Sequence, residues 1–364
     1  MSNKKESLME RLEKDVVLVA EGYIFELERR GYLKAGPFVP EVVLEHPDAV
    51  KELHYEFLMA GSDVIVACTY YAHRSKLKAI DKEDRLEELN LKSISLAQEV
   101  AQKGGALVAG NLSNTWEFNH NDPAKSGKIV RSIFKEQVDW ASRENADFII
   151  AETFSHLGEA SIALEVIKDA GFPAVITFTT VHEKSCDGYS WEEACRILEK
   201  NGADVVGLNC GRGPETLMPI VQRVRDKVKG HVAVLPVPYR TTPKEPCFFD
   251  LRLENSKNAF PVALDPFLLT RFEMADFTVK ARDMGVNYIG ICCGAGPHHV
   301  RAMAEALGRK VPASKYSPDI NLHPVFGDQD AKKQHYVECL LGPNVPVGLN
   351  RLNPDFSRVR PNKR

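Results

Sequence analysis

Three cysteines in this sequence stand where they could bind a metal ion. Cys210 ends one apolar run and precedes a glycine, and Cys292-Cys293 ends another and precedes Gly294. Thiolates bind Zn²⁺ in tetrahedral geometry, and three protein ligands leave one position for a substrate. The sequence has no Cys-x-x-Cys pair, so two interpretations stay open at this level: a zinc site, or three small buried side chains.

Acidic and aromatic residues also follow apolar runs. The segments are Glu21-Gly22-Tyr23, Tyr70-Tyr71 and Glu152-Thr153. Where several strand ends meet at one edge of a fold, side chains of these types share a site. The question is therefore which elements carry them.

Eight short apolar runs, rich in β-branched residues, recur along the chain, and helical patterns separate them. The runs are 16–19, 63–67, 106–109, 147–151, 174–178, 204–208, 231–235 and 287–291. Helices are expected around 50–57 and over 83–103, 128–144, 157–170, 191–201, 217–228, 271–284 and 297–307. This alternation predicts an α/β protein of the (β/α)8 TIM barrel type, with an open doubly wound sheet as the alternative. In a barrel, the residues named above share the rim at the C-terminal ends of the strands.

Composition excludes several other classes of protein. The 364 residues hold 47 Lys and Arg against 50 Asp and Glu, so no basic excess exists to bind nucleic acid. Residues 1–15 lack the apolar region of a signal peptide, and no apolar run is long enough to span a membrane. We expect a cytoplasmic protein in which Cys68, Cys186, Cys195, Cys247 and Cys339 are reduced packing residues.

The chain divides into a barrel at 1–309 and a C-terminal extension at 310–364, which is rich in Pro and Asn. The extension is too short for a separate domain. It is expected to serve as an oligomerisation arm, which predicts a homo-oligomer, either a dimer or a tetramer.

Two motifs carry a family resemblance. Gly207-Leu208-Asn209-Cys210, together with Gly290-Ile291-Cys292-Cys293-Gly294, resembles the paired signature of the homocysteine S-methyltransferase family. The similarity runs from about residue 12 to residue 307 and is strongest to the betaine-dependent members through 28–32, 34–37, 45–47 and 70–72. The resemblance implies a zinc-bearing barrel that methylates homocysteine to methionine.

The resemblance also implies roles for particular residues. Zn²⁺ would be held by Cys210, Cys292 and Cys293, and the amino group of homocysteine by Glu152, with Gly22 in the same subsite. The donor pocket would contain Tyr71, with Tyr70 before it, and Phe38 stands where the family has a tryptophan. The animal betaine enzymes read Asp-Gly-Gly where this chain reads Ala20-Glu21-Gly22.

The implied donor is a small onium ion. A methylated onium centre cannot donate a hydrogen bond, so aromatic rings are expected to surround it, each contact contributing roughly 0.5–2 kcal/mol. The expected rings are Tyr23, Phe38, Tyr70 and Tyr71, and Glu21 either attracts the onium charge or caps a helix. Glycine betaine is the expected donor. Because the acid after the first strand is altered, a sulfonium (dimethylsulfoniopropionate or S-methylmethionine) is the alternative, and a non-catalytic zinc- or onium-binding barrel is the alternative of another class.

One loop remains open to interpretation. The segment 240–265 is long for a barrel loop and is either a cover over the donor or a packed surface excursion. Arg212 and Arg240 are candidates for binding a donor carboxylate.

Overall fold

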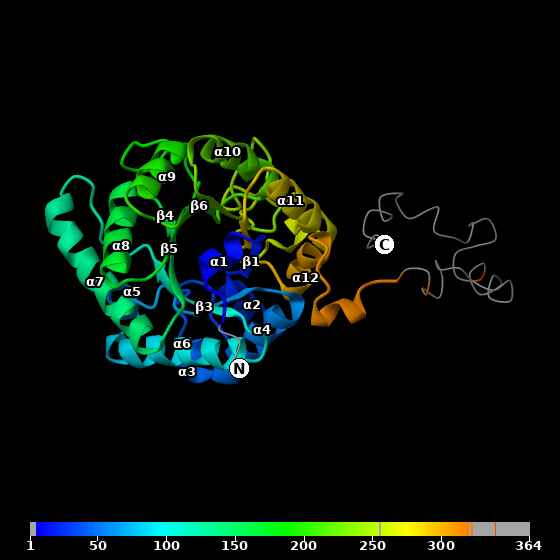
Figure 1. Ribbon diagram of the computed structural model, residues 1–364, viewed down its shortest axis with the longest axis horizontal. Helices are drawn as coiled ribbons and strands as arrows, with labels where there is room; N and C mark the ends of the chain where they lie inside the picture. Colours follow the sequence, from blue (N-terminus) through cyan, green and yellow to red (C-terminus); the bar gives the residue numbers. More distant parts are fainter. Residues whose placement is uncertain (1–4, 255, 320–321, 323–338, 340–364) are drawn as a thin grey trace.

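The structure is a computed structural model that describes residues 5–254, 256–319, 322 and 339. Its centre is a closed barrel of eight parallel strands in sequence order, with β8 pairing with β1. Helices surround the barrel (Figure 1). The predicted (β/α)8 barrel is therefore confirmed, and the doubly wound sheet is wrong.

Every predicted apolar run forms a strand. The strands are β1 (Val17–Ala20), β2 (Val64–Val66), β3 (Leu107–Ser113), β4 (Phe148–Phe154), β5 (Ala174–Phe178), β6 (Val205–Asn209), β7 (His231–Leu235) and β8 (Tyr288–Ile291). Almost all their residues are buried because side chains fill the barrel inside and helices cover it outside. β3 and β4 extend further than predicted, so Asn111 and Glu152 lie within strands. Both side chains are polar, but they bond to each other across the two strands.

The predicted helices are also present. They are α4 (Pro47–Ala60), α6 (Leu86–Ala101), α7 (Pro123–Arg143), α8 (Leu157–Asp169), α9 (Trp191–Lys200), α10 (Pro214–Lys227), α11 (Arg271–Asp283) and α12 (Pro297–Ala306). Shorter helices that the sequence analysis missed are α1 (Leu8–Leu12), α2 (Tyr23–Arg29), α3 (Val42–Glu45) and α5 (Arg74–Lys78), with 3₁₀ turns at η1 (Glu83–Arg85), η2 (Asp265–Phe267) and η3 (Pro312–Tyr316). A helix of two turns or fewer is too short to show a helical spacing of apolar residues in the sequence. The one sequence signal was the capping box of Ser7 and Glu10 at the start of α1.

The loop between β7 and α11 forms a second hydrophobic cluster, separate from the main core. Phe248, Leu251 and Leu264 of this loop are buried together with Phe25, Cys210 and Cys292. The loop is thus packed against the rim that carries the cysteines. Of the two interpretations, the structure supports a packed segment lying beside the cysteine site.

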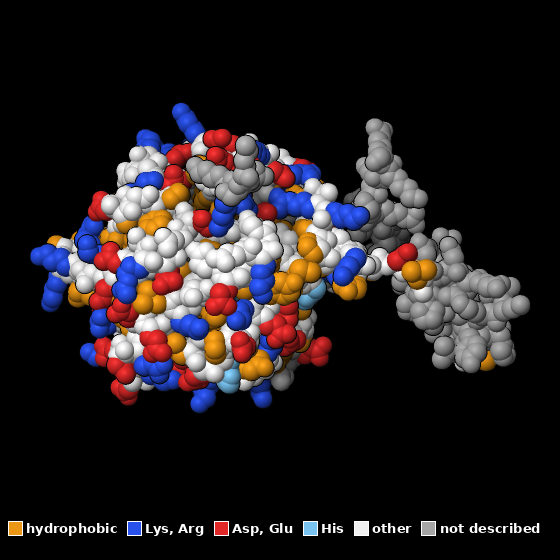
Figure 2. All heavy atoms as spheres, turned by 60° about the horizontal axis from the view of Figure 1, so that its bottom comes forward, with side chains coloured by type: hydrophobic (Ala, Val, Ile, Leu, Met, Phe, Trp, Pro, Cys, Tyr) orange, Lys and Arg blue, Asp and Glu red, His pale blue; other side chains and the backbone are white. Residues whose placement is uncertain are grey.

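Charges of both signs are interspersed over the face shown in Figure 2. Within the described residues, none of the helices combines the length and apolarity needed to cross a bilayer. Most of the predicted C-terminal extension lies outside the described residues.

Candidate functional site

The three predicted ligands meet at one point on the rim. The Sγ atom of Cys293 lies 3.8 Å from that of Cys210 and 3.9 Å from that of Cys292, and all three sulfurs lie within 4.8 Å of one another. Two Zn–S bonds of about 2.3 Å at a tetrahedral angle place their sulfurs about 3.8 Å apart. The arrangement therefore fits one tetrahedral metal ion. Cys293 is only partly buried, which leaves one side of the trio accessible.

Close backbone packing holds the cysteines in place. A Cβ atom on Gly22, whose φ is +77°, would lie 2.5 Å from the backbone nitrogen of Cys293. A Cβ on Gly290 would lie 2.5 Å from the carbonyl oxygen of Val19, which pairs with it across β1 and β8. Both positions therefore require glycine, because strand β1 and its following turn press against the strand end that carries two of the ligands.

The thiols favour a negative charge on Cys210. The pKa of Cys210 lies well below its ordinary value because the S–H groups of Cys292 and Cys293 can donate to its thiolate. The same sharing raises the pKa of Cys292 and Cys293. Cys68 differs, since burial raises its pKa to about 12 without such a partner. The rim thiols are thus the ones that a soft divalent cation would take as thiolates.

A carboxylate network lies beside the sulfurs. Asn111 donates to one oxygen of the buried Glu152, and the Nδ2 atom of Asn209 donates to the other at 2.8 Å. The Oδ1 atom of Asn209 accepts from the backbone N–H of Thr153 at 3.0 Å and from the hydroxyl of Thr177 at 2.9 Å. Burial raises the pKa of Glu152, and the hydrogen bonds that it accepts oppose that rise. The network fixes the orientation of Glu152 before any substrate binds.

Glu21 faces this network from the end of β1. Its side chain is 1% exposed, and among the described residues no donor faces either carboxyl oxygen. A carboxyl oxygen of Glu21, one of Glu152 and the sulfur of Cys292 lie within 4.8 Å of one another. Burial, together with the charge of Glu152, raises the pKa of Glu21 well above its ordinary value, and a protonated Glu21 can donate to Glu152.

Tyr70 and Tyr71 form the aromatic wall nearest the sulfurs. Their ring centroids lie 4.4 Å apart at an angle of 44°. Burial raises the pKa of both phenols, and the negative charge of Cys210 and Cys293 adds to the rise. Both tyrosines are therefore within electrostatic range of the sulfur trio.

The other predicted ring residues lie further from that wall. Phe38 stacks on Phe25, with centroids 5.4 Å apart and planes 6° apart, and it borders the second hydrophobic cluster. Tyr23 packs against His54, and its hydroxyl accepts from the N–H of Val66 at 3.3 Å. Within the described part of the chain, no ring contact joins Tyr23 or Phe38 to Tyr70 or Tyr71.

The candidate arginines are occupied by other partners. Arg212 donates to the carbonyl of Thr180 at 2.6 Å and to Glu183 at 3.0 Å. Arg240 forms an ion pair with Glu273. Each guanidinium already faces a protein carboxylate, which partly neutralises its charge.

Several site residues escaped the sequence analysis. Asn209 directly precedes Cys210 in the motif, and Asn111 follows the apolar run 106–109, which were the available signals, whereas nothing marked Lys76 or Trp116. Left-handed backbone also gathers here, because φ lies between 52° and 65° at Phe38, Tyr71, Trp116, Thr153 and Cys210. Such conformations are costly for residues with a side chain and occur often at functional sites.

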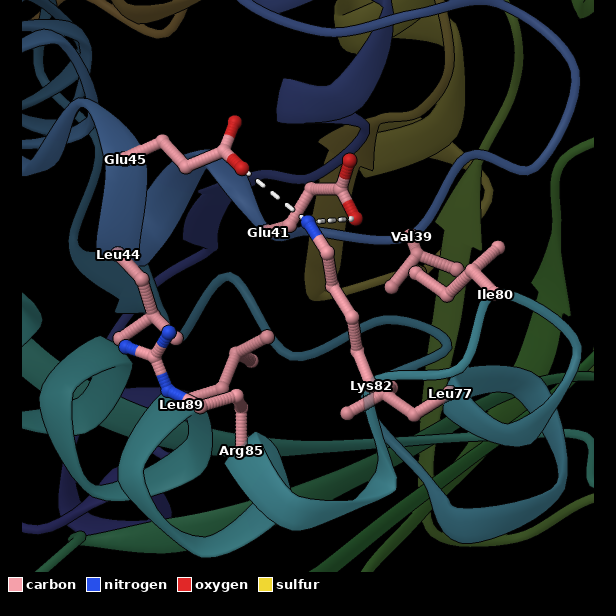
Figure 3. Close-up of a pocket in the computed structure, with 9 residues that line it drawn as sticks. All are labelled: Val39, Glu41, Leu44, Glu45, Leu77, Ile80, Lys82, Arg85 and Leu89. Atoms are coloured by element: carbon pink, nitrogen blue, oxygen red, sulfur yellow. Dashed lines mark hydrogen bonds and ion pairs between the residues drawn. The ribbon is translucent and has the colours of Figure 1, made fainter.

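A surface pocket lies away from the sulfurs, between α3 and the segment from α5 to α6 (Figure 3). In it, the Nζ atom of Lys82 lies 3.2 Å from a carboxylate oxygen of Glu41 and 3.1 Å from one of Glu45. Val39 and Leu77 line the same pocket. Val39 directly follows Phe38 in the chain, and Leu77 directly follows Lys76 on α5, so the pocket contacts both of these segments.

Comparison with known proteins agrees with this geometry. The sequence model of a family described as homocysteine S-methyltransferase matches residues 20–307. The chain is 40% identical over 314 residues to betaine–homocysteine S-methyltransferase 1 of Xenopus laevis, covering 83% of this chain and 76% of that protein. It is 37% identical over 354 residues to an S-methylmethionine–homocysteine S-methyltransferase of Pongo abelii, covering 93% of each.

Solved structures show the same fold. The crystal structure of the homocysteine methyltransferase MmuM from Escherichia coli, in its metallated form, superposes with a TM-score of 0.64 at 19% identity. The match covers 80% of this chain and 96% of that one.

Proposed function

Since the chain belongs to the homocysteine S-methyltransferase family and is an enzyme, we propose that it transfers a methyl group from a small onium donor to homocysteine. We further propose that Zn²⁺ is its cofactor and that glycine betaine is its donor. The observation that carries the proposal is the sulfur trio at zinc spacing, with Glu152 and the Tyr70–Tyr71 wall beside it. Cys210, Cys292 and Cys293 would hold the metal, which supplies a position where a thiol is deprotonated at neutral pH.

Glu152 is the proposed partner of the homocysteine ammonium group. Asn111 donates to one of its oxygens, and Asn209 and Thr153 donate to the other, so the oxygen that meets Asn111 keeps an acceptor position for a further donor. Gly22 belongs to the same subsite, since it packs on the backbone of Cys293 and any larger residue would fill the space.

The donor subsite follows from the charges around it. Methyl transfer to sulfur is an in-line displacement: a lone pair of the sulfur forms the new S–CH₃ bond, and the breaking C–N or C–S bond returns its electrons to the leaving group. A neutral amine or thioether departs, so no general acid is required. Tyr70 and Tyr71 would hold the onium centre by cation–π contacts, with Phe38, Tyr23 and Glu21 in the surrounding layer.

A sulfonium donor is the second candidate. The S-methylmethionine enzyme is 37% identical over 93% of this chain, which is similar to the 36% identity over 96% of this chain found for a betaine enzyme of Mus musculus. The altered residue Glu21 has a carboxyl oxygen within 4.8 Å of one of Glu152 and of the sulfur of Cys292, the residues proposed to meet homocysteine and the metal. Both donors use the same displacement chemistry, so the choice between them does not alter the roles proposed above.

The test is methionine formation by the zinc-loaded protein from homocysteine and a panel of donors. The panel contains glycine betaine, dimethylsulfoniopropionate, S-methylmethionine and methyltetrahydrofolate. Turnover with glycine betaine supports the proposal, and turnover with a sulfonium alone moves the donor to the second candidate. One bound zinc per chain without transfer from any donor would overturn the enzymatic role and leave a binding protein.

We also propose that the protein is cytoplasmic and forms a homo-oligomer, either a dimer or a tetramer, with residues 310–364 as the oligomerisation arm. Light scattering on the full chain and on a chain ending at 319 tests this, because loss of the arm should reduce the measured mass to that of a smaller assembly.

A further inference from the structure

A lysine beside the aromatic wall has no acidic partner. The Nζ atom of Lys76, on α5, lies 4.1 Å from the ring centroid of Tyr71 and 4.8 Å from that of Trp116. Among the described residues, no carboxylate forms an ion pair with it. Its ammonium group is held by two aromatic faces alone.

The surroundings leave this cation only partly hydrated. Burial lowers the pKa of Lys76 from its ordinary value. Trp116, one of its two aromatic neighbours, is 71% exposed, which is unusual for an indole. The neighbouring Leu77 is fully buried in the pocket of Figure 3, so α5 is anchored and the position of Lys76 is set by the fold.

The other cations considered for a carboxylate are already paired. Arg212 and Arg240 each have an acidic protein partner, and Arg74 on α5 pairs with Glu136 at 2.7 Å. Lys76 is thus the cation of this group whose charge is not neutralised by an ion pair within the described residues.

The charges at the rim also orient a donor that carries both signs. Three thiolates around a divalent cation leave a net negative charge, and Glu152 adds a carboxylate to the same part of the rim. An onium centre is attracted to that part, and a carboxylate on the same molecule is repelled from it. A carboxylate directed away from the sulfurs can meet Lys76, whose Nζ atom lies 4.1 Å from the ring centroid of Tyr71.

We propose that Lys76, held by Tyr71 and Trp116, binds the carboxylate of the methyl donor and so selects onium carboxylates over onium ions without an acid group. This inference rests on the proposed function and refines its donor. Lys76 is assigned to binding and takes no part in the displacement itself.

The test compares two ligands that differ in one charge, glycine betaine and its methyl ester. Both are measured by calorimetry on the zinc-loaded protein with homocysteine present, and by methionine formation. Lys76→Met should weaken the binding of glycine betaine by about tenfold or more, which is the usual effect of losing one hydrogen bond between charged groups. The unmodified chain should bind glycine betaine more tightly than its methyl ester, and Lys76→Met should bind the two ligands about equally.

Two further variants serve as controls. Lys76→Arg keeps the positive charge and should retain the preference for glycine betaine. Lys78→Met removes an exposed lysine from the same short helix and should leave the preference as in the unmodified chain.

Each outcome has a distinct meaning. Equal losses for both ligands in Lys76→Met, or no loss for either, would overturn the inference even if methionine forms. Charge-selective binding of glycine betaine without methionine formation would support the inference and refute the proposed transfer. A protein that binds neither ligand refutes both.

Discussion

Replacing Glu152 by glutamine separates the role of its charge from its role in the fold. The two side chains have the same shape, but the amide has one acceptor and one donor in place of two acceptors. Asn209 cannot turn to suit it, because its Oδ1 accepts from Thr153 and Thr177. Asn111 can turn, because its own Oδ1 has no partner among the described residues. The introduced amide therefore keeps its oxygen towards Asn209 and places its NH₂ towards a reoriented Asn111.

The structure sets the size of both effects. Because every hydrogen bond can be remade, Glu152→Gln should change the free energy of unfolding by less than about 1 kcal/mol. Asn209→Ala is the structural control. It removes five hydrogen bonds, one of them to the sulfur of Cys292, and should cost about 4 kcal/mol. For the substrate, loss of a charge-assisted bond to the ammonium is worth about 1.5–3 kcal/mol, which raises the KM for homocysteine about 10- to 150-fold.

The assay pairs homocysteine with 4-mercaptobutyrate, the same thiol without its amino group. Glu152→Gln should raise the KM for homocysteine only, while the zinc content and the denaturation midpoint stay near those of the unmodified chain. A rise of similar size for both thiols would refute the assignment, because it would show that Glu152 acts on the metal site or the fold and not on the ammonium group.

Three further changes test other parts of the site. Cys292→Ala should abolish zinc retention and methyl transfer together, as measured by metal analysis and methionine formation, and full activity in the metal-free variant would contradict the proposed chemistry. Gly22→Ala should weaken zinc binding at least tenfold because its Cβ meets the backbone of Cys293, whereas Gly31→Ala, with φ +80° against +77° and open space around it, should cost only the backbone strain. Burial lowers the pKa of His54 to about 3, so His54 is neutral in the folded state. Its contribution to the free energy of unfolding is therefore complete above its unfolded pKa near 6.5 and is lost as the pH falls towards 3. His54→Leu should therefore remove about 2 kcal/mol of the stability lost between pH 7.5 and pH 5, measured by denaturant unfolding at both pH values, and an unchanged pH dependence would show that His54 is already solvated.

Much of the fold could be predicted because barrel strands are buried on both faces. Runs such as 174–178 and 231–235 are apolar except for Thr177 and His231, and their boundaries in the structure are the predicted ones. The predicted boundaries of β3 and β4 were short because Asn111 and Glu152 are polar, and polarity marks a strand end when residues are read one segment at a time. Only their pairing across neighbouring strands shows that the two side chains satisfy each other.

The sequence by itself determined the barrel and the meeting of Cys210 with Cys292 and Cys293, because a closed parallel sheet brings all its strand ends to one rim. The tertiary structure alone decided what surrounds them. Asn209 holds Glu152, Glu21 lies near Glu152 and Cys292, and Lys76 contacts the rings of Tyr71 and Trp116. These contacts join segments that are far apart in the sequence and are not related by a regular spacing. They also depend on side-chain directions, which are set by packing and by left-handed backbone at single residues such as Tyr71. Local propensity does not encode such directions, so they become visible only when the whole barrel is closed.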